Sequence, residues 1–592
     1  MGLYNDASLI FLPSGGAGKD TKAYSVKPTD GTGDFTFSRG SNLAATRVGP
    51  TGLIEKGREN HILHSQNLTN AVYIDGGSSG YSVVRTANYG NAPDGTQTAD
   101  RIQISRPSGN TYAEIYQRLS TLAGSACVLS FYGKSLSGNA TLYGGYSNAY
   151  VGEFDFTTEW QRFQVFIPNA GNQTGFNLLT WESLPSTSQS ADVLIWGVQL
   201  EQGLAATDYI ESGATTGKAG LLEDEPRFDY SGGASCPSLL LEPQRSNLLP
   251  YSEYFGASNW TKTNVAVTDN ATTSPEGVDN AVQITESASG LNVYAPSDTL
   301  SGSASSYTYS AFLKQGSLRY GGIRAIVNGF ANRFFVNVDL QEGTITDTDT
   351  TGTGVTWSYD IEDYGSGWYR VWISGTNTSG NIDLAIGLSN SATPTFLSGL
   401  PYYTGTGSDY IYAYGAQAEA GSYPTSYIPN HSGGSVTRGE DDINKLTGVG
   451  VTSDEFTIFL EFDLSDTPLV HNPGTYFQTF DSSNNSQQEF RFFTWAGEQV
   501  LVPYFRQNFS YPFGNGTDAV RFDGKILFRA DGGGGYTMFF GFNGSSTKEV
   551  RTGLTAYTLN KIDFLSQPKT NVKQLLIFNE ALSDADCITL TT

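Results

Sequence analysis

Positive charge is scarce in this 592-residue sequence. Lys and Arg number 34 against 58 Asp and Glu, so the formal net charge is −24, and charged residues make up only 16 % of the chain. Proteins that bind nucleic acid hold the phosphates with clustered Lys and Arg. The balance therefore predicts no nucleic-acid partner, and we interpret the negative excess as an aid to solubility.

Cysteine, histidine and long apolar runs are also in short supply. The three cysteines lie far apart, without a disulfide framework or metal-ligand spacing, so we expect small buried hydrophobes: Cys127, Cys236 and Cys587. The four histidines are too scattered to favour a catalytic triad or a zinc site: His61, His64, His431 and His471. No stretch approaches the roughly 18 apolar residues of a membrane span, and residues 1–13 lack the basic start of a signal peptide. We expect no membrane insertion, no signal peptide and no cofactor.

Glycine and aromatic residues are abundant instead, with 69 Gly, 34 Tyr and 34 Phe. Short runs rich in Val, Ile, Thr, Tyr and Phe are separated by clusters of Gly, Asn, Ser and Pro. This pattern is typical of β-sandwiches and barrels. It predicts a mainly β protein with few helices.

An internal repeat divides the chain. Val193–Gly203 (VLIWGVQLEQG) matches Ile411–Gly421 (IYAYGAQAEAG), and both copies continue to a Tyr-Ile pair. At the front of each copy, Asn60–Leu68 matches Asn247–Phe255. Units of this length fit a tandem domain duplication rather than a short solenoid repeat.

Alternation along the strands predicts which side chains face inward. In the last strand of each unit it places Trp196 and Tyr414 in the core. The pattern restarts after residue 443, and Glu455–Leu464 alternates strictly, with its Phe, Ile and Leu residues on one face. We therefore expect a third sandwich, which ends in a short helix capped by Ser583.

Several segments resemble bacteriophage virion proteins. Phe37–Val48 (FSRGSNLAATRV) with Gly52–Glu55 is similar to a segment that recurs in such proteins, and Pro226–Leu249 is similar to the linker that precedes a jelly-roll carbohydrate-binding-like module. The Gly-x-Gln-x-Glu-x-Gly and Tyr-Ile ending resembles the close of such modules. Leu575–Asp584 resembles the closing strand of a laminin-G or concanavalin-like lectin sandwich. One whole unit lies between segments that the family places nearly adjacent, which looks like an inserted duplicate.

The expected fold class is therefore mainly β, with tandem jelly-roll β-sandwiches, a concanavalin-like β-sandwich and a short N-terminal attachment segment. The expected boundaries are 1–59 for the attachment or linker segment, 60–212 for the first carbohydrate-binding-like module, 213–245 for a linker, 246–443 for the second module and 444–592 for the concanavalin- or laminin-G-like lectin sandwich.

The best enzymatic hint is Glu461-Phe-Asp463-Leu-Ser-Asp466. It resembles the Glu-x-Asp-x-x-Glu strand of concanavalin-fold glycoside hydrolases, where paired carboxylates act as nucleophile and acid. Asp466 departs from that pattern, because it has the wrong parity without a bulge and a shorter reach than Glu. A solvated strand face is the interpretation we favour, and we expect no enzymatic activity and no catalytic residue. Asp30–Asp34 and Asp347–Asp349 could hold a structural calcium ion, with plain turns as the alternative.

Binding chemistry suits the composition better. Sugars bind against aromatic ring faces, with a few polar groups that fix their orientation. Three groups of aromatic residues fit this chemistry, with core or subunit packing as the alternative, and they are our candidate carbohydrate contacts: Tyr143, Tyr146 and Tyr150; Trp357, Tyr402 and Tyr403; and Trp495, Tyr504, Phe509 and Tyr511.

Together these features predict a structural phage fibre or appendage protein, a tail or head fibre on the virion surface, that displays carbohydrate-binding-like domains for adhesion to host or mucosal glycans. The resemblance implies a homo-oligomer, with a trimer favoured, and attachment to other virion proteins through the N-terminal segment. Two alternatives stay open: a concanavalin-fold polysaccharide depolymerase, and a capsid or tail decoration protein that binds no glycan.

Overall fold

The computed structural model describes most of the chain, and the mainly β fold class is confirmed. The described residues are 2–13, 18–19, 21–40, 43–109, 111–146, 149–184, 187–288, 294–302, 306–327, 331–376, 380–445, 450–463, 474–481, 483, 486–495, 498–505, 520–521, 524–553, 555–564 and 569–592. Side chains are also described there except at 18–19, 145–146, 149–151, 294–302, 380–382, 445, 474–476, 486–495, 498–505, 520–521 and 551. Within these ranges the α-helices are α1 (Gly2–Asp6) and α2 (Asp584–Thr591), and neither is long and apolar enough to cross a bilayer.

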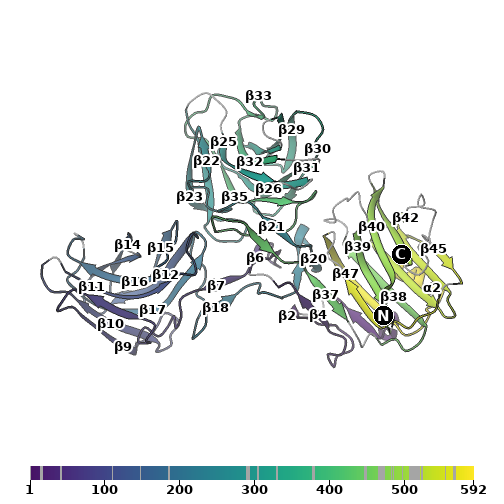
Figure 1. Cartoon of the computed structure of the whole chain (residues 1–592), viewed down its shortest axis with the longest axis horizontal. Helices are drawn as coiled ribbons and strands as arrows, with labels where there is room; N and C mark the ends of the chain where they lie inside the picture. Colours follow the sequence, from purple (N-terminus) through teal and green to yellow (C-terminus); the bar gives the residue numbers. More distant parts are fainter. Residues whose placement is uncertain are drawn as a thin grey trace.

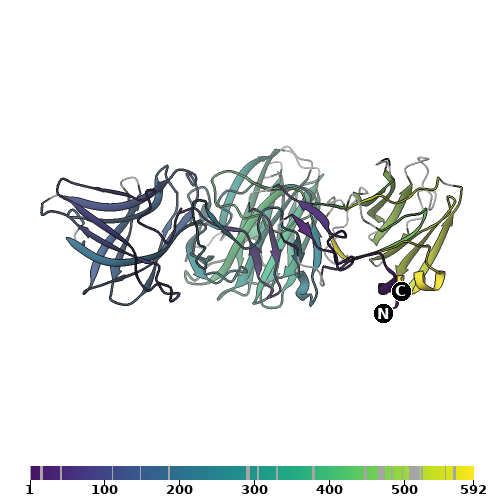
Figure 2. The ribbon, with the colours of Figure 1, turned by 90° about the horizontal axis from the view of Figure 1, so that it is seen from below.

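Three β-sandwiches surround a central hub, which we define as residues 43–60, 213–247 and 431–441. We call residues 61–212 module 1 and residues 248–430 module 2, and the sandwich that contains both chain termini is the C-terminal sandwich. Figure 1 shows module 1 in purple and blue at one end, module 2 in teal above the centre, and the C-terminal sandwich mostly in green and yellow at the other end. Seen from below, the three lie roughly in a row (Figure 2). Both chain termini lie in the C-terminal sandwich in both views.

Module 1 packs two five-stranded antiparallel sheets face to face. The first has the order β15 (Gln161–Ile167), β12 (Cys127–Ser135), β17 (Ser190–Gln202), β10 (Ala99–Ser105) and β9 (Ser82–Gly90). The second has the order β14 (Ala149–Phe156), β13 (Ala140–Tyr146), β16 (Thr174–Trp181), β11 (Tyr112–Leu119) and β8 (Ile74–Gly77). Apolar side chains from both sheets, such as Ile102, Phe131 and Phe176, form the core between them, as two packed sheets require.

Module 2 repeats this arrangement with six strands in each sheet. One sheet has the order β23 (Val265–Thr272), β24 (Ala281–Glu286), β35 (Tyr410–Ala420), β26 (Ser306–Gln315), β31 (Trp368–Thr376) and β30 (Thr356–Asp363). The other has the order β22 (Thr261–Thr263), β25 (Tyr294–Gly302), β32 (Gly380–Ser389), β27 (Tyr320–Val327), β28 (Asn332–Asp339) and β29 (Thr344–Thr351). Module 2 also contains the pair β33 (Phe396–Leu397) and β34 (Leu400–Pro401).

The C-terminal sandwich is assembled from distant parts of the chain. One sheet joins β19 (Arg227–Asp229), β20 (Ser238–Leu241), β47 (Thr570–Phe578), β38 (Glu455–Asp463), β43 (Lys525–Asp531), β44 (Tyr536–Phe542) and β45 (Ser545–Arg551), and β1 (Leu9–Phe11) also pairs with β47. The other joins β2 (Gly18–Lys19), β3 (Lys22–Ala23), β4 (Phe35–Ser38), β37 (Asp442–Lys445), β46 (Lys561–Phe564), β39 (Gly474–Phe480), β40 (Ser486–Trp495), β41 (Glu498–Phe505) and β42 (Val520–Arg521).

This assembly corrects the expectation of a separate attachment segment over 1–59 and of a sandwich confined to 444–592. Strand β1 pairs with β47 from Leu9 to Phe11, and β4 pairs with β37. The apolar side chains of Phe11, Phe35 and Phe37 are fully buried in the core of the C-terminal sandwich. The sequence could not reveal this, because the pairing partners are more than 400 residues away. Modules 1 and 2 are in effect insertions into the C-terminal sandwich.

The repeated Gly-x-Gln-x-Glu motif closes each module from within. In module 1, Glu201 accepts hydrogen bonds from the backbone N–H and the hydroxyl of Thr207, at 2.8 and 2.7 Å, and Gln199 accepts one from the N–H of Ile210 at 2.7 Å. Module 2 repeats the same bonds with the same lengths through Gln417, Glu419, Thr425 and Ile428. These buried polar groups are therefore structural.

Trp196 and Tyr414 are buried as predicted, at 5 % and 1 % exposure, but they lie on the opposite face of the strand from the one that alternation predicts. Gly197 has φ = +64°, a conformation that favours glycine, and the register between β12 and β17 shifts beside it. A β-bulge at this point reverses the alternation. Ile195 and Val198 enter the core, whereas Trp196 packs with Leu194 on the outer face of the sheet. Gly415, with φ = +58°, does the same for Tyr414 in module 2.

Two smaller expectations can be checked directly. Ser583 caps α2, since its hydroxyl accepts a hydrogen bond from the N–H of Asp586 at 3.2 Å. Cys127 and Cys587 are buried as expected, but Cys236 is exposed in the loop between β19 and β20. The expectation was wrong for Cys236 because it lies at a hairpin end rather than in a strand.

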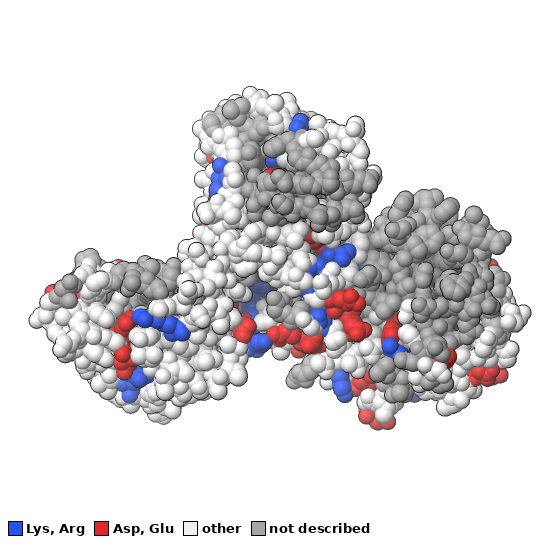
Figure 3. All heavy atoms as spheres, in the orientation of Figure 1, with Lys and Arg blue, Asp and Glu red and all other residues white. Residues whose placement is uncertain are grey.

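Buried ion pairs hold the hub together. The carboxylate of Glu242 accepts hydrogen bonds from the guanidinium groups of Arg227 and Arg438, each at 2.7 Å, and all three side chains are fully buried. Asp441 pairs with Arg227 and, at 3.3 Å, with Arg39. Figure 3 shows charged side chains gathered around the hub while much of the described module surface is uncharged. Buried charges of one sign need partners of the opposite sign. The cluster therefore ties the linker between the modules to Arg39, which precedes module 1, and to Arg438 and Asp441, which follow module 2.

Candidate functional site

The candidate aromatic residues of module 1 lie on one hairpin, β13–β14. Tyr143 is half-buried on β13 and donates a hydrogen bond from its hydroxyl to Glu153 at 2.8 Å. Tyr146 is on β13 and Tyr150 is on β14, but their side chains lie outside the described part. Tyr143 is therefore the residue of this group whose side chain can be assigned to a surface.

The candidate residues of module 2 are not gathered together. Trp357 on β30 stacks on Phe334 of the core, with ring centroids 5.4 Å apart. Tyr403 also packs on that core and donates a hydrogen bond to Glu286 at 2.6 Å, whereas Tyr402 is 40 % exposed. In the C-terminal sandwich, Trp495 is on β40 and Tyr504 on β41, without described side chains. Phe509 and Tyr511 lie outside the described residues.

The structure places Tyr143 on a polar-aromatic surface that the sequence reasoning missed. We call it the tyrosine face; it is formed by outward side chains of the sheet β14–β13–β16–β11–β8: Ile74, Tyr112, Glu114, Tyr116, Arg118, Tyr143, Asn177 and Trp181. The register sets Tyr112 opposite Trp181 and Tyr116 opposite Asn177. The alternation Tyr-x-Glu-x-Tyr-x-Arg over 112–118 was the signal that could have found it, because these residues share one face of a strand.

Polar groups lie between the rings of the tyrosine face. Asn177 donates a hydrogen bond to Glu114 at 2.8 Å, and Arg118 lies 3.3 Å from the same carboxylate. The Arg118 guanidinium also lies over the Tyr116 ring, 3.8 Å from its centroid. Asn177 is only 5 % exposed, and its Oδ1 accepts no hydrogen bond. The guanidinium of Arg118 and the carboxylate of Glu114 are therefore the polar groups that this surface offers to a ligand.

The equivalent face of module 2 is covered by its own chain. There the segment 390–401 lies over the sheet: Phe396 packs on Phe335 with centroids 5.7 Å apart, and Asn337 donates hydrogen bonds to the carbonyls of Ser391 and Ala392 at 3.0 and 3.2 Å. Phe335 and Asn337 are completely buried as a result. In module 1, by contrast, Glu153 and Asp155 of the equivalent strand β14 are exposed, and Tyr143 of β13 is half-buried. The part of the tyrosine face on β13 and β14 is therefore open where its duplicate is closed.

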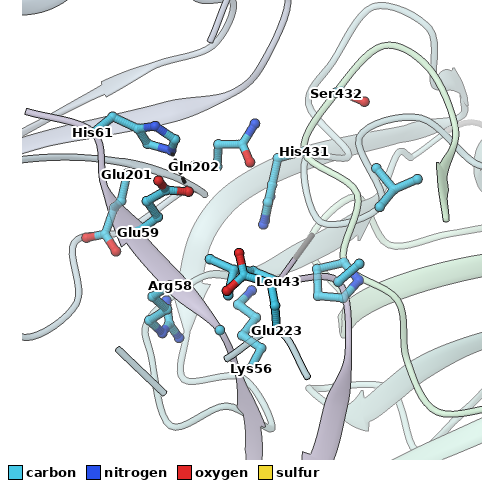
Figure 4. A pocket seen from close by; sticks show the side chains of 14 residues that line it. Leu43, Lys56, Arg58, Glu59, His61, Glu201, Gln202, Glu223, His431 and Ser432 are labelled. Atoms are coloured by element: carbon cyan, nitrogen blue, oxygen red, sulfur yellow. Dashed lines mark ion pairs between the residues drawn. The ribbon is translucent and has the colours of Figure 1, made fainter. Parts of the chain in front are cut away.

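A cavity of about 330 Å³ lies in the hub between the two modules. Figure 4 shows His61, Glu59 and Glu201 on one side of it, His431 on the other, and Lys56 below. His61 and His431, which are far apart in the sequence, thus line one cavity.

The ionic groups around this cavity are engaged with the fold. Lys56 pairs with Glu253 at 2.9 Å and with Glu276 at 2.6 Å, and Arg58 pairs with Glu276 at 2.6 Å. Glu201 belongs to the motif that closes module 1. We therefore interpret the cavity as part of the junction between the modules rather than as the principal binding site.

Burial sets the charge state of the histidines in this cavity. Burial lowers the pKa of His431 to about 4, although Glu253 at 3.8 Å acts in the opposite direction, and the positive charges of Lys56 and Arg58 lower it further. Burial also lowers the pKa of His61. Both imidazoles are therefore neutral at pH 7.

The carboxylates singled out as an enzymatic hint lie on β38. Asp463 pairs with Lys573 at 3.1 Å, and Glu461 is half-buried opposite Lys525. Asp466 and His471 are outside the described residues. Among the residues that are described, no group of three or more His, Cys, Asp or Glu side chains is arranged to hold a metal ion.

No family model matches the chain, and no curated protein is significantly similar to it. Among solved structures, the CBM22-1–CBM22-2 tandem domain from Paenibacillus barcinonensis Xyn10C aligns with 65 % of this chain and 100 % of its own, at 12 % identity and a TM-score of 0.20. A family 32 glycoside hydrolase from Bifidobacterium adolescentis aligns with 78 % of this chain and 99 % of its own, at 8 % identity and a TM-score of 0.13. TM-scores this low carry no argument about fold or function.

Proposed function

We propose that the chain is a structural appendage protein of a bacteriophage virion, and that the tyrosine face of module 1 binds neutral glycans of the host surface or of mucus. The observation that carries the binding proposal is the contrast between the two modules. The tyrosine face is open in module 1, whereas in module 2 segment 390–401 covers the equivalent face along strand β28.

The chemistry of the face suits a hydroxyl-rich ligand. Rings such as Tyr112 and Trp181 offer apolar surface to the C–H groups of a sugar, and the Glu114–Asn177–Arg118 group offers acceptors and donors. Glu153 on the adjacent strand β14 adds negative charge beside Tyr143. These carboxylates disfavour acidic sugars by repulsion, so the proposed ligands are neutral.

Display on a virion fits the way the modules are joined. Module 1 contacts module 2 directly, through the Tyr251 hydroxyl on the Gly124 carbonyl at 2.8 Å and the Phe166 and Tyr254 rings at 5.1 Å. Module 1 lies at the opposite end from the chain termini (Figures 1 and 2). The virion assignment and the trimer rest on the resemblance of segments 37–55 and 226–249 to phage proteins. We propose binding rather than cleavage, because the carboxylate of the face, Glu114, is engaged by Asn177 and Arg118.

A glycan array tests the proposal. Labelled full-length protein is applied to printed mucin O-glycans and neutral bacterial surface polysaccharides, and the best ligand is then titrated by calorimetry. Tyr116→Ala should weaken binding by about tenfold or more, as expected when an aromatic contact is truncated. Tyr89→Ala is the matched control, since Tyr89 is 47 % exposed on the opposite sheet of the same module.

The proposal fails if no printed neutral glycan binds at millimolar concentration. It also fails if Tyr116→Ala and Tyr89→Ala bind equally well.

A further inference from the structure

Module 1 has a second outward surface that is duplicated in module 2. We call it the tryptophan face, and it lies on the sheet β15–β12–β17–β10–β9. Its six residues and their counterparts in module 2 are Tyr132 and Phe312, Lys134 and Lys314, Trp160 and Trp368, Arg162 and Arg370, Trp196 and Tyr414, and Tyr209 and Tyr427.

The two copies share their internal contacts as well as their residues. Lys134 lies over the Trp160 ring at 5.3 Å, and Lys314 lies over Trp368 at 5.8 Å. Arg162 lies over Tyr132 at 5.4 Å, as its counterpart in module 2 does over Phe312 at 5.6 Å. Each Arg also donates a hydrogen bond to a serine of the neighbouring strand, at 3.2 and 3.0 Å. The faces are therefore equivalent in geometry, and their difference lies in what covers them.

In module 2 this face is occupied by a hairpin of the same chain, β5 (Thr46–Val48) and β6 (Ile54–Lys56). Ile54 packs in the cluster that contains Phe312, Trp368, Tyr414 and Tyr427. The Thr46 hydroxyl donates to the Tyr427 carbonyl at 2.6 Å, and the Ile54 N–H donates to the Pro275 carbonyl at 2.9 Å. Under this hairpin the ring of Trp368 is 1 % exposed.

Charge pairs complete this docking. Lys56 at the end of the hairpin binds Glu253 and Glu276 of module 2. The counterparts of these two acids in module 1 are Gln66 and Asp94, in the matching segments Ser65–Gln66 and Pro93–Gly95. Gly95 follows Asp94 and Gly277 follows Glu276, with φ of +87° and +77° respectively, so the two loops have the same turn conformation.

In module 1 the rings of the face remain partly open. Trp196 is 5 % exposed, but Tyr132, Trp160 and Tyr209 are half-buried. Beside them lies a groove of about 770 Å³, lined in part by Arg162 and Tyr209.

The chain has a second hairpin like β5–β6, but it is already in use. Hairpin β19–β20 repeats the same Arg and Glu pair, with Arg227 and Glu242 in place of Arg47 and Glu55. Strand β20 pairs with β47 of the C-terminal sandwich. No third hairpin of this kind is present among the described residues.

We propose that the tryptophan face of module 1 is a docking site for a β-hairpin of a second polypeptide chain. The hairpin has the chemistry of β5–β6: a branched aliphatic side chain that packs between Tyr132 and Trp160, and one Lys or Arg that pairs with Asp94. Aromatic and Arg side chains of this kind are typical anchors of protein interfaces.

A peptide tests this surface on the intact protein. The probe is a head-to-tail cyclised peptide of residues 45–58, titrated into the full chain by calorimetry. We expect saturable binding with a dissociation constant of about 1 mM or tighter. Trp160→Ala and the peptide change Ile54→Ala should each weaken it by about tenfold or more.

A second protein variant guards against a folding defect in Trp160→Ala. Asp94 is exposed and accepts hydrogen bonds from the N–H and the hydroxyl of Thr96 at 2.9 and 2.7 Å, so Asp94→Lys changes a surface turn and no buried side chain. It should weaken binding more at low salt than at high salt, because it repels Lys56 of the peptide. Tyr116→Ala on the tyrosine face is the control and should bind the peptide normally.

Three results would overturn the proposal. One is the absence of saturable binding up to about 5 mM peptide, roughly fivefold above the weakest dissociation constant that we expect. Another is equal binding by the original protein, Trp160→Ala and Asp94→Lys. The third is glycan binding that Trp160→Ala abolishes while Tyr116→Ala preserves it, which would assign this face to carbohydrate instead.

Discussion

Replacement of Glu242 by Gln should loosen the hub. Its carboxylate accepts four hydrogen bonds, from Arg227 and Arg438 at 2.7 Å each and from the N–H and hydroxyl of Ser426 at 2.8 and 2.6 Å. Burial alone would raise the pKa of Glu242, but the two arginine charges lower it well below its ordinary value of 4.5. Glu242→Gln keeps the shape of the side chain but removes the negative charge that neutralises the two buried guanidinium groups. Loss of one partner of a buried ion pair costs about 3–5 kcal/mol.

The duplication supplies a matched control at Glu55, the counterpart of Glu242. Glu55 pairs with Arg47 at 2.8 Å, but the two side chains are 36 % and 25 % exposed. Exposed ion pairs contribute about 0–1 kcal/mol. Glu55→Gln should therefore leave the hub almost as stable as before.

Native-state hydrogen exchange is the suitable assay, because unfolding of a chain with three sandwiches is not two-state. The amides of β19, β20 and β36 (Val436–Arg438) report on the opening of the hub. In Glu242→Gln they should exchange roughly a hundred- to several-thousandfold faster, which corresponds to about 3–5 kcal/mol. Equal exchange in Glu242→Gln and Glu55→Gln would refute the reasoning.

The same variant has a defined pH dependence. Because the folded-state pKa of Glu242 is lowered, its stabilisation is complete above its ordinary value of 4.5 and is lost as the pH falls below it. The melting temperatures of the original protein and of Glu242→Gln should therefore converge in acid. A difference that stays constant from pH 7 to pH 3 would contradict this.

Two further predictions concern the junction and the duplicated faces. The unfolded chain protonates His431 near its ordinary value of 6.5 but the folded chain only near 4, so stability should fall by up to about 3 kcal/mol between pH 6.5 and 4. His431→Asn should remove this loss of stability between pH 6.5 and 4, as measured by the melting temperature at each pH. If the melting temperature of the variant depends on pH as that of the original protein does, His431 is not the cause. Trp368→Ala should cost about 3–5 kcal/mol, because the ring is buried under β5–β6. Trp160→Ala should cost much less in the same scanning calorimetry, and equal losses would mean that the two faces are equally covered.

Sequence reasoning located the candidate site only in part. It identified Tyr143 through a glycine- and tyrosine-rich run, but it passed over Tyr112 and Tyr116, which lie in an ordinary-looking strand. Their importance depends on Asn177 and Trp181, which only the register of β11 with β16 brings beside them. Strand register is set by pairing between distant segments, so it could not be read from either strand alone.

Local features of the sequence were sufficient for the fold class, the duplication and the Ser583 cap. Alternation, turn residues and capping act between near neighbours, and they are visible in any single sequence. Alternation failed at Trp196, where the bulge at Gly197 reverses the facing of the strand.

The tertiary structure decided which surfaces are covered. The sequence by itself determined that two similar modules exist with aromatic residues at matching positions and the same closing motif. It could not show that segment 390–401 covers strand β28 and that hairpin β5–β6 covers the other sheet of module 2, whereas the corresponding surfaces of module 1 stay partly open. Nor could it show that residues 9–38 complete the C-terminal sandwich. Burial and pairing are properties of distant segments brought together, so two similar surfaces come to differ in what covers them only once the chain is folded.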